Sequence, residues 1–333
     1  MEKILFLAHT DSGGTLGKPA LEALNAALSL GGPLTVGLSG SATQAGADQI
    51  AGCGAVRFLT VIGEQFAAPR YATDAAAAEA LCRAASCDIV IAAGTSRWAR
   101  VLPGVAYRLG GRVDTHATGL AMTDGAPAVT RWFYRQRMEA VLARTQRPWI
   151  VMLDPGCVAA WSGAAGTAAT EAVPVEAATR TTVTGYRAPQ SDEQTIRPDA
   201  KVLLVAGAGW TKKQGDGAVH AKEAEDLILG FLRTAQASLG SSKSLVDQSG
   251  EGQAVLTCLS HMNQIGQTGS TPRHAKGLST CCHGEEPHVV GWRFINERRA
   301  INLDAGCGWA RGKADVLYVA DAFEVMRSIN ALL

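Results

Sequence analysis

The sequence lacks an excess of charge, long apolar runs and a recognisable leader. Its 31 basic and 30 acidic residues give a formal net charge of +1, and no basic run suggests a nucleic-acid partner. No apolar run reaches the roughly 18 residues that a membrane-spanning helix needs. Residues 1–7 enter a strand-like run without the cleavage pattern of a signal peptide. These absences predict a cytoplasmic protein with no nucleic-acid partner and no membrane insertion.

Motifs of hydrolytic and metal chemistry are also missing. There is no Gly-x-Ser-x-Gly elbow, and no acid–base pair can be identified from spacing, so a hydrolase is not indicated. The eight cysteines are scattered and follow no secretion signal, which favours free thiols in a reducing compartment. The residues closest to a metal-ligand pattern are Cys258, His261, Cys281, Cys282, His283 and Cys307. Adjacent cysteines on a strand point to opposite faces, so Cys281 and Cys282 do not readily share one ion, and we expect no metal site.

The sequence does contain enough apolar residues for two folded domains. It has 333 residues, of which 47% are hydrophobic and 18% charged, as in globular proteins. Residues 185–198 are typical of a linker. We therefore place a boundary near residue 195, between domains at 1–195 and 196–333.

Apolar strands alternate with amphipathic helices along both domains. Strands are expected at 3–8, 33–38, 56–61, 87–93, 113–121, 126–133, 138–143, 149–153 and 173–176, and helices at 18–30, 42–51, 73–85 and 98–109. In the second domain, strands are expected at 201–206, 254–259, 277–282, 299–303 and 316–319, and helices at 223–239 and 323–332. This alternation is typical of parallel sheets covered on both faces. The expected fold class is α/β, with two doubly wound parallel-sheet domains, of which the first is Rossmann-like.

Four short segments allow both a ligand-binding and a structural interpretation. Residues 13–17 follow the first strand, but their glycine spacing does not fit a dinucleotide fingerprint. Residues 93–96 lie where such folds bind ligands, or form an ordinary strand-to-helix turn. Residues 207–209 read Gly-Ala-Gly after a strand, without the third glycine. Residues 132–137 combine aromatic and arginine side chains and are either a partner surface or a sheet edge.

The densest group of ligand-binding residue types is Gln264-Ile265-Gly266-Gln267-Thr268-Gly269. Its glycines allow a ligand to approach the backbone closely, and its amides and hydroxyl can hydrogen-bond a phosphate or a ring edge. A surface turn has the same composition, so the surrounding sequence must decide between the two.

Several ordered motifs around this loop resemble the α-subunit of electron-transfer flavoproteins. That family carries Ser-Arg-x-x-Val-Asp, Val-Gly-Gln-Thr-Gly, Ser-Gly-Ala-Ile-Gln-His, Ala-Ile-Asn-Lys-Asp and a late acidic segment, in this order. The corresponding segments here begin at Ser242, Ile265, His283, Ala300 and Ala314. The spacing from Thr268 to Asn302 needs no gap. Segments of the first domain also resemble the corresponding segments of the family, so the resemblance covers nearly the full length of the chain.

The resemblance implies that the second domain is an FAD-binding domain of the DHS-like type, with one FAD per α-subunit. The residues that it assigns to the cofactor are Ser242, Lys243, Ile265, Gly266, Gln267, Thr268, His283, Gly284, His288, Asn302, Asp321 and Ala322. Gln267, Thr268 and Ser242 correspond to family contacts with the flavin and its pyrophosphate. His288 corresponds to the histidine at the pyrimidine edge, where a donor stabilises negative charge on the reduced ring. Asn302 and Asp321 correspond to contacts on the ribityl-adenosine side.

Two cationic positions depart from the family pattern. Lys243 stands where the family has an arginine, so it keeps the charge but lacks the planar fork. The family's Gly-Gly-Arg-Gly segment reads Gly-Ala-Gly-Trp at 207–210, which removes that arginine. Lys212 or Lys213 would have to replace its phosphate contact.

The segment beside the expected pyrimidine edge departs as well. His283 replaces a serine, and Glu285 and Glu286 stand in its apolar middle. Carboxylates that face a flavin lower its reduction potential, because they repel the added electrons. We expect a shifted potential and altered FAD binding. A flavin titration that matches an ordinary family member in both one-electron steps would contradict this.

The resemblance implies an electron carrier without catalytic residues of its own. Paired with a β-subunit that usually binds AMP, such a protein accepts electrons from a flavin-dependent dehydrogenase. It passes them to a quinone oxidoreductase or an iron–sulfur protein. The first domain contacts the β-subunit, and motion of the second gates transfer. The alternatives are an electron-bifurcating member with a second FAD, a flavin-free paralogue with a structural or nucleotide-binding role, and a standalone oxidoreductase.

Overall fold

The structure, a computed structural model, describes most of the chain. The described residues are 2–133, 138–177, 179–186, 196–197, 199–247, 255–265, 274–280, 295–307, 310–311 and 314–333. Backbone contacts divide the chain into two compact units, Met1–Tyr186 and Arg187–Leu333. Among the described helices, none combines the length and apolar character needed to cross a bilayer.

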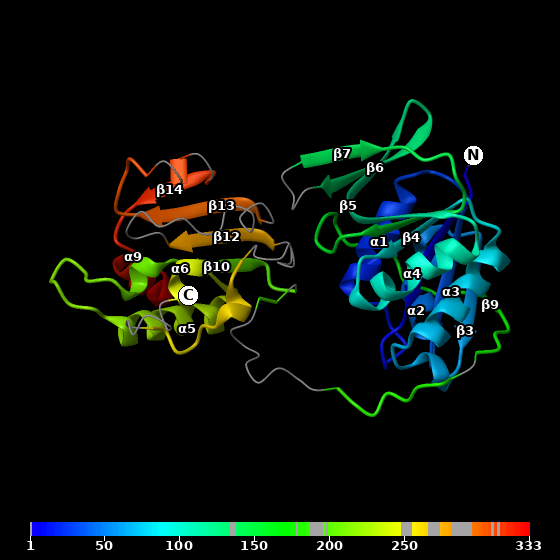
Figure 1. The fold of residues 1–333 in the computed structure, drawn as a ribbon, viewed down its shortest axis with the longest axis horizontal. Helices are drawn as coiled ribbons and strands as arrows, with labels where there is room; N and C mark the ends of the chain where they lie inside the picture. Colours follow the sequence, from blue (N-terminus) through cyan, green and yellow to red (C-terminus); the bar gives the residue numbers. More distant parts are fainter. Residues whose placement is uncertain are drawn as a thin grey trace. The chain divides into compact units, whose positions relative to one another are not determined.

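In the described part of the first unit, nine strands form one sheet (Figure 1). They are β1 (Ile4–His9), β2 (Leu34–Gly40), β3 (Arg57–Ile62), β4 (Ile89–Ala93), β5 (Arg112–Thr123), β6 (Ala126–Phe133), β7 (Met138–Leu142), β8 (Trp149–Leu153) and β9 (Thr170–Ala172). The order across the sheet is β7-β6-β5-β8-β4-β1-β2-β3-β9. From β5 to β9 all neighbouring strands are parallel. The main helices are α1 (Lys18–Leu28), α2 (Gln44–Gln49), α3 (Tyr71–Ala85) and α4 (Ser96–Arg108).

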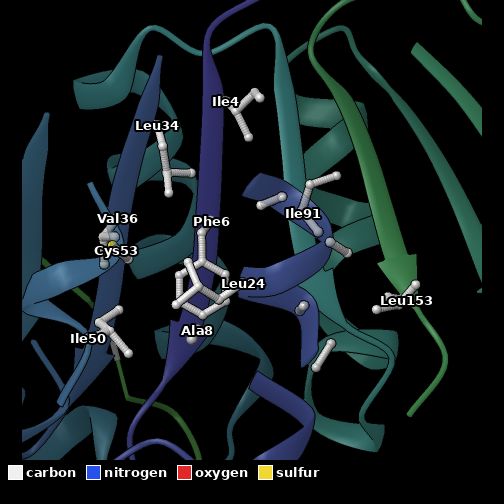
Figure 2. Close-up of a cluster of buried hydrophobic side chains, with 14 of the residues drawn as sticks. Ile4, Phe6, Ala8, Leu24, Leu34, Val36, Ile50, Cys53, Ile91 and Leu153 are labelled. Carbon is white, nitrogen blue, oxygen red and sulfur yellow. The ribbon is translucent and has the colours of Figure 1, made fainter. Parts of the chain in front are cut away.

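The side chains of β1 alternate between two hydrophobic cores, one on each face of the sheet. Ile4, Phe6 and Ala8 share a core with α1, whereas Leu5 and Leu7 pack with residues of α3 and α4. Figure 2 shows the first of these cores around Phe6. A strand places successive side chains on opposite faces, so an unbroken apolar strand needs helices on both. The predicted α/β fold is confirmed.

The expected strands at 113–121, 126–133 and 138–143 are present, but they run antiparallel to one another. β5 pairs with β6, and β6 with β7, in antiparallel register. Asp124 and Gly125 alone connect β5 to β6, and both have left-handed φ values, 51° and 77°. Two residues are too few for a crossover between parallel strands, and Asp-Gly is a favoured two-residue hairpin turn. The all-parallel prediction is therefore wrong at this end of the sheet, and the sequence contained the signal for the hairpin.

A buried carboxylate joins this antiparallel extension to the parallel part of the sheet. Asp114 of β5 is 2% exposed. It accepts hydrogen bonds from Arg144 Nε (2.9 Å), Trp149 Nε1 (3.0 Å) and Arg131 Nη1 (3.2 Å). Burial raises the pKa of Asp114, but these three donors together outweigh it, so the net pKa lies below the ordinary value. The ionised form is the one that stabilises the fold.

We expect Asp114→Asn to destabilise the protein by about 2–3 kcal/mol at neutral pH, because two arginines lose their counter-ion. The folded-state pKa of Asp114 is lowered, so its contribution is complete above the unfolded value of about 4 and is lost as pH falls through the folded pKa. The difference in unfolding free energy between wild type and variant should therefore shrink below about pH 4. Urea unfolding over a pH series checks this. A difference that stays constant through the acid range would show that the carboxylate is not what stabilises the cluster.

The second unit is built on a smaller sheet. In its described part, the strands are β10 (Val202–Ala206), β11 (Ser238–Ser241), β12 (His274–Thr280), β13 (Ile295–Asn302) and β14 (Val316–Val319). The order is β11-β10-β12-β13-β14, and every neighbouring pair is parallel. The helices α5 (Ala221–Ala235) and α9 (Ala322–Leu332) pack side by side against one face (Figure 1). The opposite face of β10, formed by Leu203 and Val205, packs against Ile265 and Ala310.

The helix expected at 223–239 ends earlier than predicted. α5 stops at Ala235, because Gln236 adopts a left-handed φ of 47°. The chain then continues as β11, whose apolar Leu239 is fully buried in the sheet. The predicted helix included the first residues of this strand, so the sequence did not predict β11 as a strand at the edge of the sheet.

Two expected strands also differ from the structure. The described residues of the segment 254–259 form a turn, in which Thr257 donates from its backbone N (3.3 Å) and its Oγ1 (2.5 Å) to Glu225. These side-chain bonds hold the segment to α5 and leave its backbone out of the sheet. The strand expected at 173–176 is displaced to Thr170–Ala172, where it pairs with β3.

Candidate functional site

The candidate site lies at the carboxyl ends of the strands in the second unit. In the sheet, β10 lies between β11 and β12. The chain therefore leaves β10 toward β11 on one side and later returns to β12 on the other side. In open parallel sheets, such a switch point leaves a crevice for a ligand. Here Gly207 N donates to Thr280 O (3.1 Å), and Trp210 Nε1 donates to Thr280 Oγ1 (2.6 Å). These bonds fix the two strand ends that border the switch point.

The start of the Gln-Thr-Gly loop lies beside the end of β11. Ser241 and Gln264 form a parallel bridge, and Ile265 N donates to Ser241 O (3.1 Å). Gly240 makes this approach possible, since a Cβ there would lie 2.5 Å from Ile265 Cγ2. Ser242 follows directly and is fully buried. The structure thus brings together two segments that the sequence predicted to share a site.

Three buried side chains along this edge have polar atoms without a hydrogen-bond partner among the described residues. They are Ser241 (0% exposed, Oγ), Gln264 (6%, Nε2 and Oε1) and Asn302 (1%, Nδ2). Asn302 ends β13, and its Oδ1 accepts a bond from Asp304 N (2.8 Å), which leaves its NH₂ group. An unpaired buried polar group costs about 1–3 kcal/mol, so such groups are normally completed by water or a ligand. The row offers a hydroxyl, two amide donors and one amide acceptor.

Ser242 and Lys243 lie at the start of the short helix α6 (Lys243–Asp247). Ser242 Oγ accepts a bond from Leu245 N (3.3 Å), so it acts at least as a cap of this helix. The Lys243 side chain is 60% exposed, and its Nζ lies 3.7 Å from Asp247 Oδ2. Lys243 therefore brings an exposed positive charge to this edge, beside the carboxylate of Asp247.

Asp321 and Ala322 lie at the start of α9. Asp321 Oδ1 accepts bonds from Phe323 N (2.8 Å) and Glu324 N (3.1 Å), which makes it the N-cap of the helix. Ala322 is fully buried and packs in the core beneath. The structure thus gives Asp321 a structural role that does not depend on a ligand.

The remaining residues that the resemblance assigned to a cofactor lie outside the described residues. They are Gly266, Gln267, Thr268, His283, Gly284 and His288. The adjacent Cys281, Cys282, Glu285 and Glu286 lie outside them too. Their predicted roles stay predictions. In the part of the chain that is described, no group of three or more potential metal ligands comes together.

An aromatic side chain anchors the segment at 207–210. Trp210 is fully buried, and its ring meets that of Phe323 edge-on, with 4.7 Å between centroids. The segment is therefore held by packing and by the bond to Thr280. No cation stands within it, in agreement with the departure noted from the sequence.

Residues 4–182 match the family model for the electron transfer flavoprotein domain. The chain belongs to the electron transfer flavoprotein family. The match extends over more than half of the chain and almost all of the first unit. A search of curated proteins found no match. The candidate site in the second unit lies beyond the matched residues, so it rests on its own geometry.

The electron transfer flavoprotein domain has a cavity of about 920 Å³ of its own at the carboxyl ends of β1 and β4. Thr95, which lines it, caps α4 by accepting a bond from Trp98 N (3.4 Å). Arg97, also in the lining, is bound to Asp74. Residues 93–96 thus form a strand-to-helix turn in which the Thr95 hydroxyl caps α4.

The aromatic segment at 132–137 is described only in part. Trp132 and Phe133 lie in β6, which β5 and β7 flank on both sides. These two residues are therefore not on a sheet edge. Residues 134–137 lie outside the described residues, and the expectation of a partner surface remains untested there.

The sequence placed Gln264 in the candidate loop, although not among the residues that the resemblance assigned to the cofactor, and it gave no indication of Ser241. Gln264 precedes the family motif by one residue, and Ser241 lies at the end of a strand that was taken for helix. The Ser-Ser pair at 241–242, at the end of the short strand β11, was the available signal. A serine pair alone is too common to identify a ligand site, whereas burial without a partner singles out these atoms.

Proposed function

We propose that this chain is the α-subunit of an electron transfer flavoprotein and binds one FAD along the carboxyl edge of its second sheet. The observation that carries the proposal is the row of unpartnered polar atoms of Ser241, Gln264 and Asn302. β10 and β12 separate β11 from β13. Three strand spacings separate Ser241 from Asn302 by roughly 14 Å, and the strand register places the two side chains on opposite faces of the sheet, so a ligand that reaches both must extend across the strand ends, as a dinucleotide can and a small ion cannot.

The chemistry of these atoms fits FAD. The flavin ring edge and the ribityl chain present both donors and acceptors, and Gln264 offers one group of each kind. The pyrophosphate needs positive charge or backbone N–H groups, and Lys243 supplies charge at this edge. Bound FAD would supply one- and two-electron transfer. The chain itself would hold and orient the cofactor with Ser241, Gln264 and Asn302.

The proposed function includes partners. The first unit contacts a β-subunit, which binds AMP, and the heterodimer carries electrons rather than turning over a substrate of its own. A flavin-dependent dehydrogenase is the donor, and a quinone oxidoreductase or an iron–sulfur protein is the acceptor. The proposed location is the cytoplasm. This part of the proposal is supported by family membership and by the ordered motifs of the second domain.

A flavin-free paralogue is the second candidate, and specific contacts favour it. Asp321 caps α9, and Lys243 lies beside Asp247, so both have partners within the chain. Trp210 packs into the core in the segment that carries an arginine in the family pattern. These contacts stabilise the second unit without a cofactor. They do not, however, provide partners for Gln264 and Asn302.

Production of the chain together with its β-subunit tests the proposal. We expect a yellow heterodimer that releases one FAD per α-subunit when it is denatured. A colourless heterodimer would support the flavin-free paralogue, and two FAD per heterodimer would indicate an electron-bifurcating member. Failure to form any heterodimer, with FAD bound to the chain alone, would favour the standalone oxidoreductase.

A further inference from the structure

Two cysteines meet at the carboxyl end of α3, in the first unit. Ser86, which follows the helix, adopts a left-handed conformation (φ 46°, ψ 46°), and its N–H donates to Arg83 O (3.2 Å). The left-handed residue turns the chain back along the helix, and at such ends the residue after it commonly contacts the residue five positions earlier. Those two residues here are Cys87 and Cys82. The sequence therefore places two thiols at the one pair of positions that this helix end brings together.

The contacts agree with this geometry. Cys87 Sγ lies 3.8 Å from Cys82 O. The nearby Cys87 side chain, together with burial, raises the pKa of Cys82 well above its ordinary value. Neither cysteine is in a disulfide. The 3.8 Å contact places the Cys87 sulfur against the backbone carbonyl of the residue that carries the second thiol.

The two thiols differ in access. Cys82 is 4% exposed and packs in the core beneath α3, whereas Cys87 is half-buried at the helix end. A reagent from solution therefore reaches Cys87 first. Cys82 is then the neighbour that can displace whatever becomes attached to Cys87. This division into an attacking and a resolving thiol is typical of redox-active pairs.

We propose that Cys82 and Cys87 form a redox-active dithiol, which a low-molecular-weight disulfide converts into an intramolecular disulfide at the end of α3. The Cys87 thiolate attacks one sulfur of the small disulfide and releases one thiol. Cys82 then loses its proton, and its thiolate attacks the Cys87 sulfur of the mixed disulfide and releases the second thiol; because the pKa of Cys82 is raised, we expect this to be the slower step. Two protein thiols are oxidised, one small disulfide is reduced to two thiols, and the two protein protons end on those thiols.

The site is suited to direct detection, because Arg83 lies between the two cysteines. Trypsin cleaves after Arg70, Arg83 and Arg97, so Cys82 and Cys87 fall in separate peptides, 71–83 and 84–97, with one cysteine each. The full-length protein is equilibrated with glutathione disulfide, its remaining thiols are alkylated, and the digest is analysed by mass spectrometry with and without reduction. We expect the two peptides to be joined before reduction and separate after it.

Variants distinguish the proposed route from incidental oxidation. Cys82→Ser should leave a glutathione on Cys87, because no resolving thiol remains. Cys87→Ser should leave Cys82 as an unmodified thiol. Cys258→Ser is the control; its half-buried thiol has a pKa raised by burial to about 12, and the joined peptides should persist in this variant. Wild-type protein that yields the two peptides unjoined at every ratio of oxidised to reduced glutathione would overturn the proposal.

Discussion

Gln264→Met is expected to weaken FAD binding by roughly 10- to 100-fold, which corresponds to about 1.5–3 kcal/mol for an amide that makes two hydrogen bonds. Both amide atoms of Gln264 are buried and unpartnered among the described residues, and on the proposed function bound FAD would be their partner. For the same reason, the FAD-free variant should be as stable as the wild type, or more stable by about 1 kcal/mol. Methionine fills a similar volume without polar atoms. Fluorescence titration of FAD into the stripped heterodimer, together with urea unfolding of the stripped protein, measures both effects.

The same substitution at Gln49 is the matched control. Gln49 accepts a bond from Leu16 N (2.9 Å) and donates to Leu16 O (3.2 Å), so both of its amide atoms have partners. Gln49→Met should therefore lower stability by about 1–2 kcal/mol and leave FAD affinity unchanged. If Gln264→Met instead costs stability and leaves FAD affinity intact, Gln264 belongs to the core rather than to the cofactor site.

The largest loss of stability is expected from Asp74→Leu in the first unit. Asp74 is 1% exposed and binds Arg97 through Nε (2.9 Å) and Nη2 (2.6 Å). Arg97, itself 8% exposed, also donates to Phe66 O (2.6 Å). Removing the carboxylate leaves a buried guanidinium without a counter-ion, which costs about 3–5 kcal/mol. Chemical unfolding at neutral pH measures the change.

Two further variants separate this loss from a general effect of mutation. Glu171→Ala breaks an exposed pair with Arg57 (2.8 Å), and it should change the unfolding free energy by less than about 1 kcal/mol. The double variant Asp74→Leu/Arg97→Met removes both charges and should recover much of the lost stability. A double variant that is as unstable as Asp74→Leu alone would mean that packing, and not the unpaired charge, accounts for the loss.

Much of the fold follows from the sequence, because apolar runs such as residues 3–8 and 87–93 leave few alternatives to buried parallel strands. The antiparallel arrangement of β5, β6 and β7 was not predicted, because these strands were identified from their apolar residues alone and the length of the turns between them was not considered. Asp124 and Gly125 carry the missing information, because a two-residue turn with positive φ values fixes an antiparallel pair. β11 was missed for a different reason. It is four residues long and follows a strong helical pattern without a proline or glycine break.

The residues of the candidate site could be predicted from the sequence only where a residue of a ligand-binding type also stands in a family motif. Ser242 and Asn302 were chosen through family motifs, and the structure places both at the carboxyl ends of strands, where a ligand is expected. Gln264 was part of the candidate loop by residue type, whereas Ser241 has no comparable signal, because the lack of a hydrogen-bond partner is a property of the folded chain. Asp321 was chosen as a ligand contact, but its sequence context also fits a helix N-cap, and the structure shows the cap. The two roles are compatible, since the cap uses one oxygen.

Hydrogen exchange of the heterodimer with and without FAD tests the central claim most directly, because it reports where the cofactor binds. The account predicts slower exchange on FAD binding in peptides that cover residues 238–247, 258–265 and 299–306, at the ends of β11 and β13 and at the start of the loop. Exchange at residues 9–15 and 93–97, around the cavity of the first unit, should stay unchanged. Protection confined to this cavity, with none at the edge of the second sheet, would contradict the account.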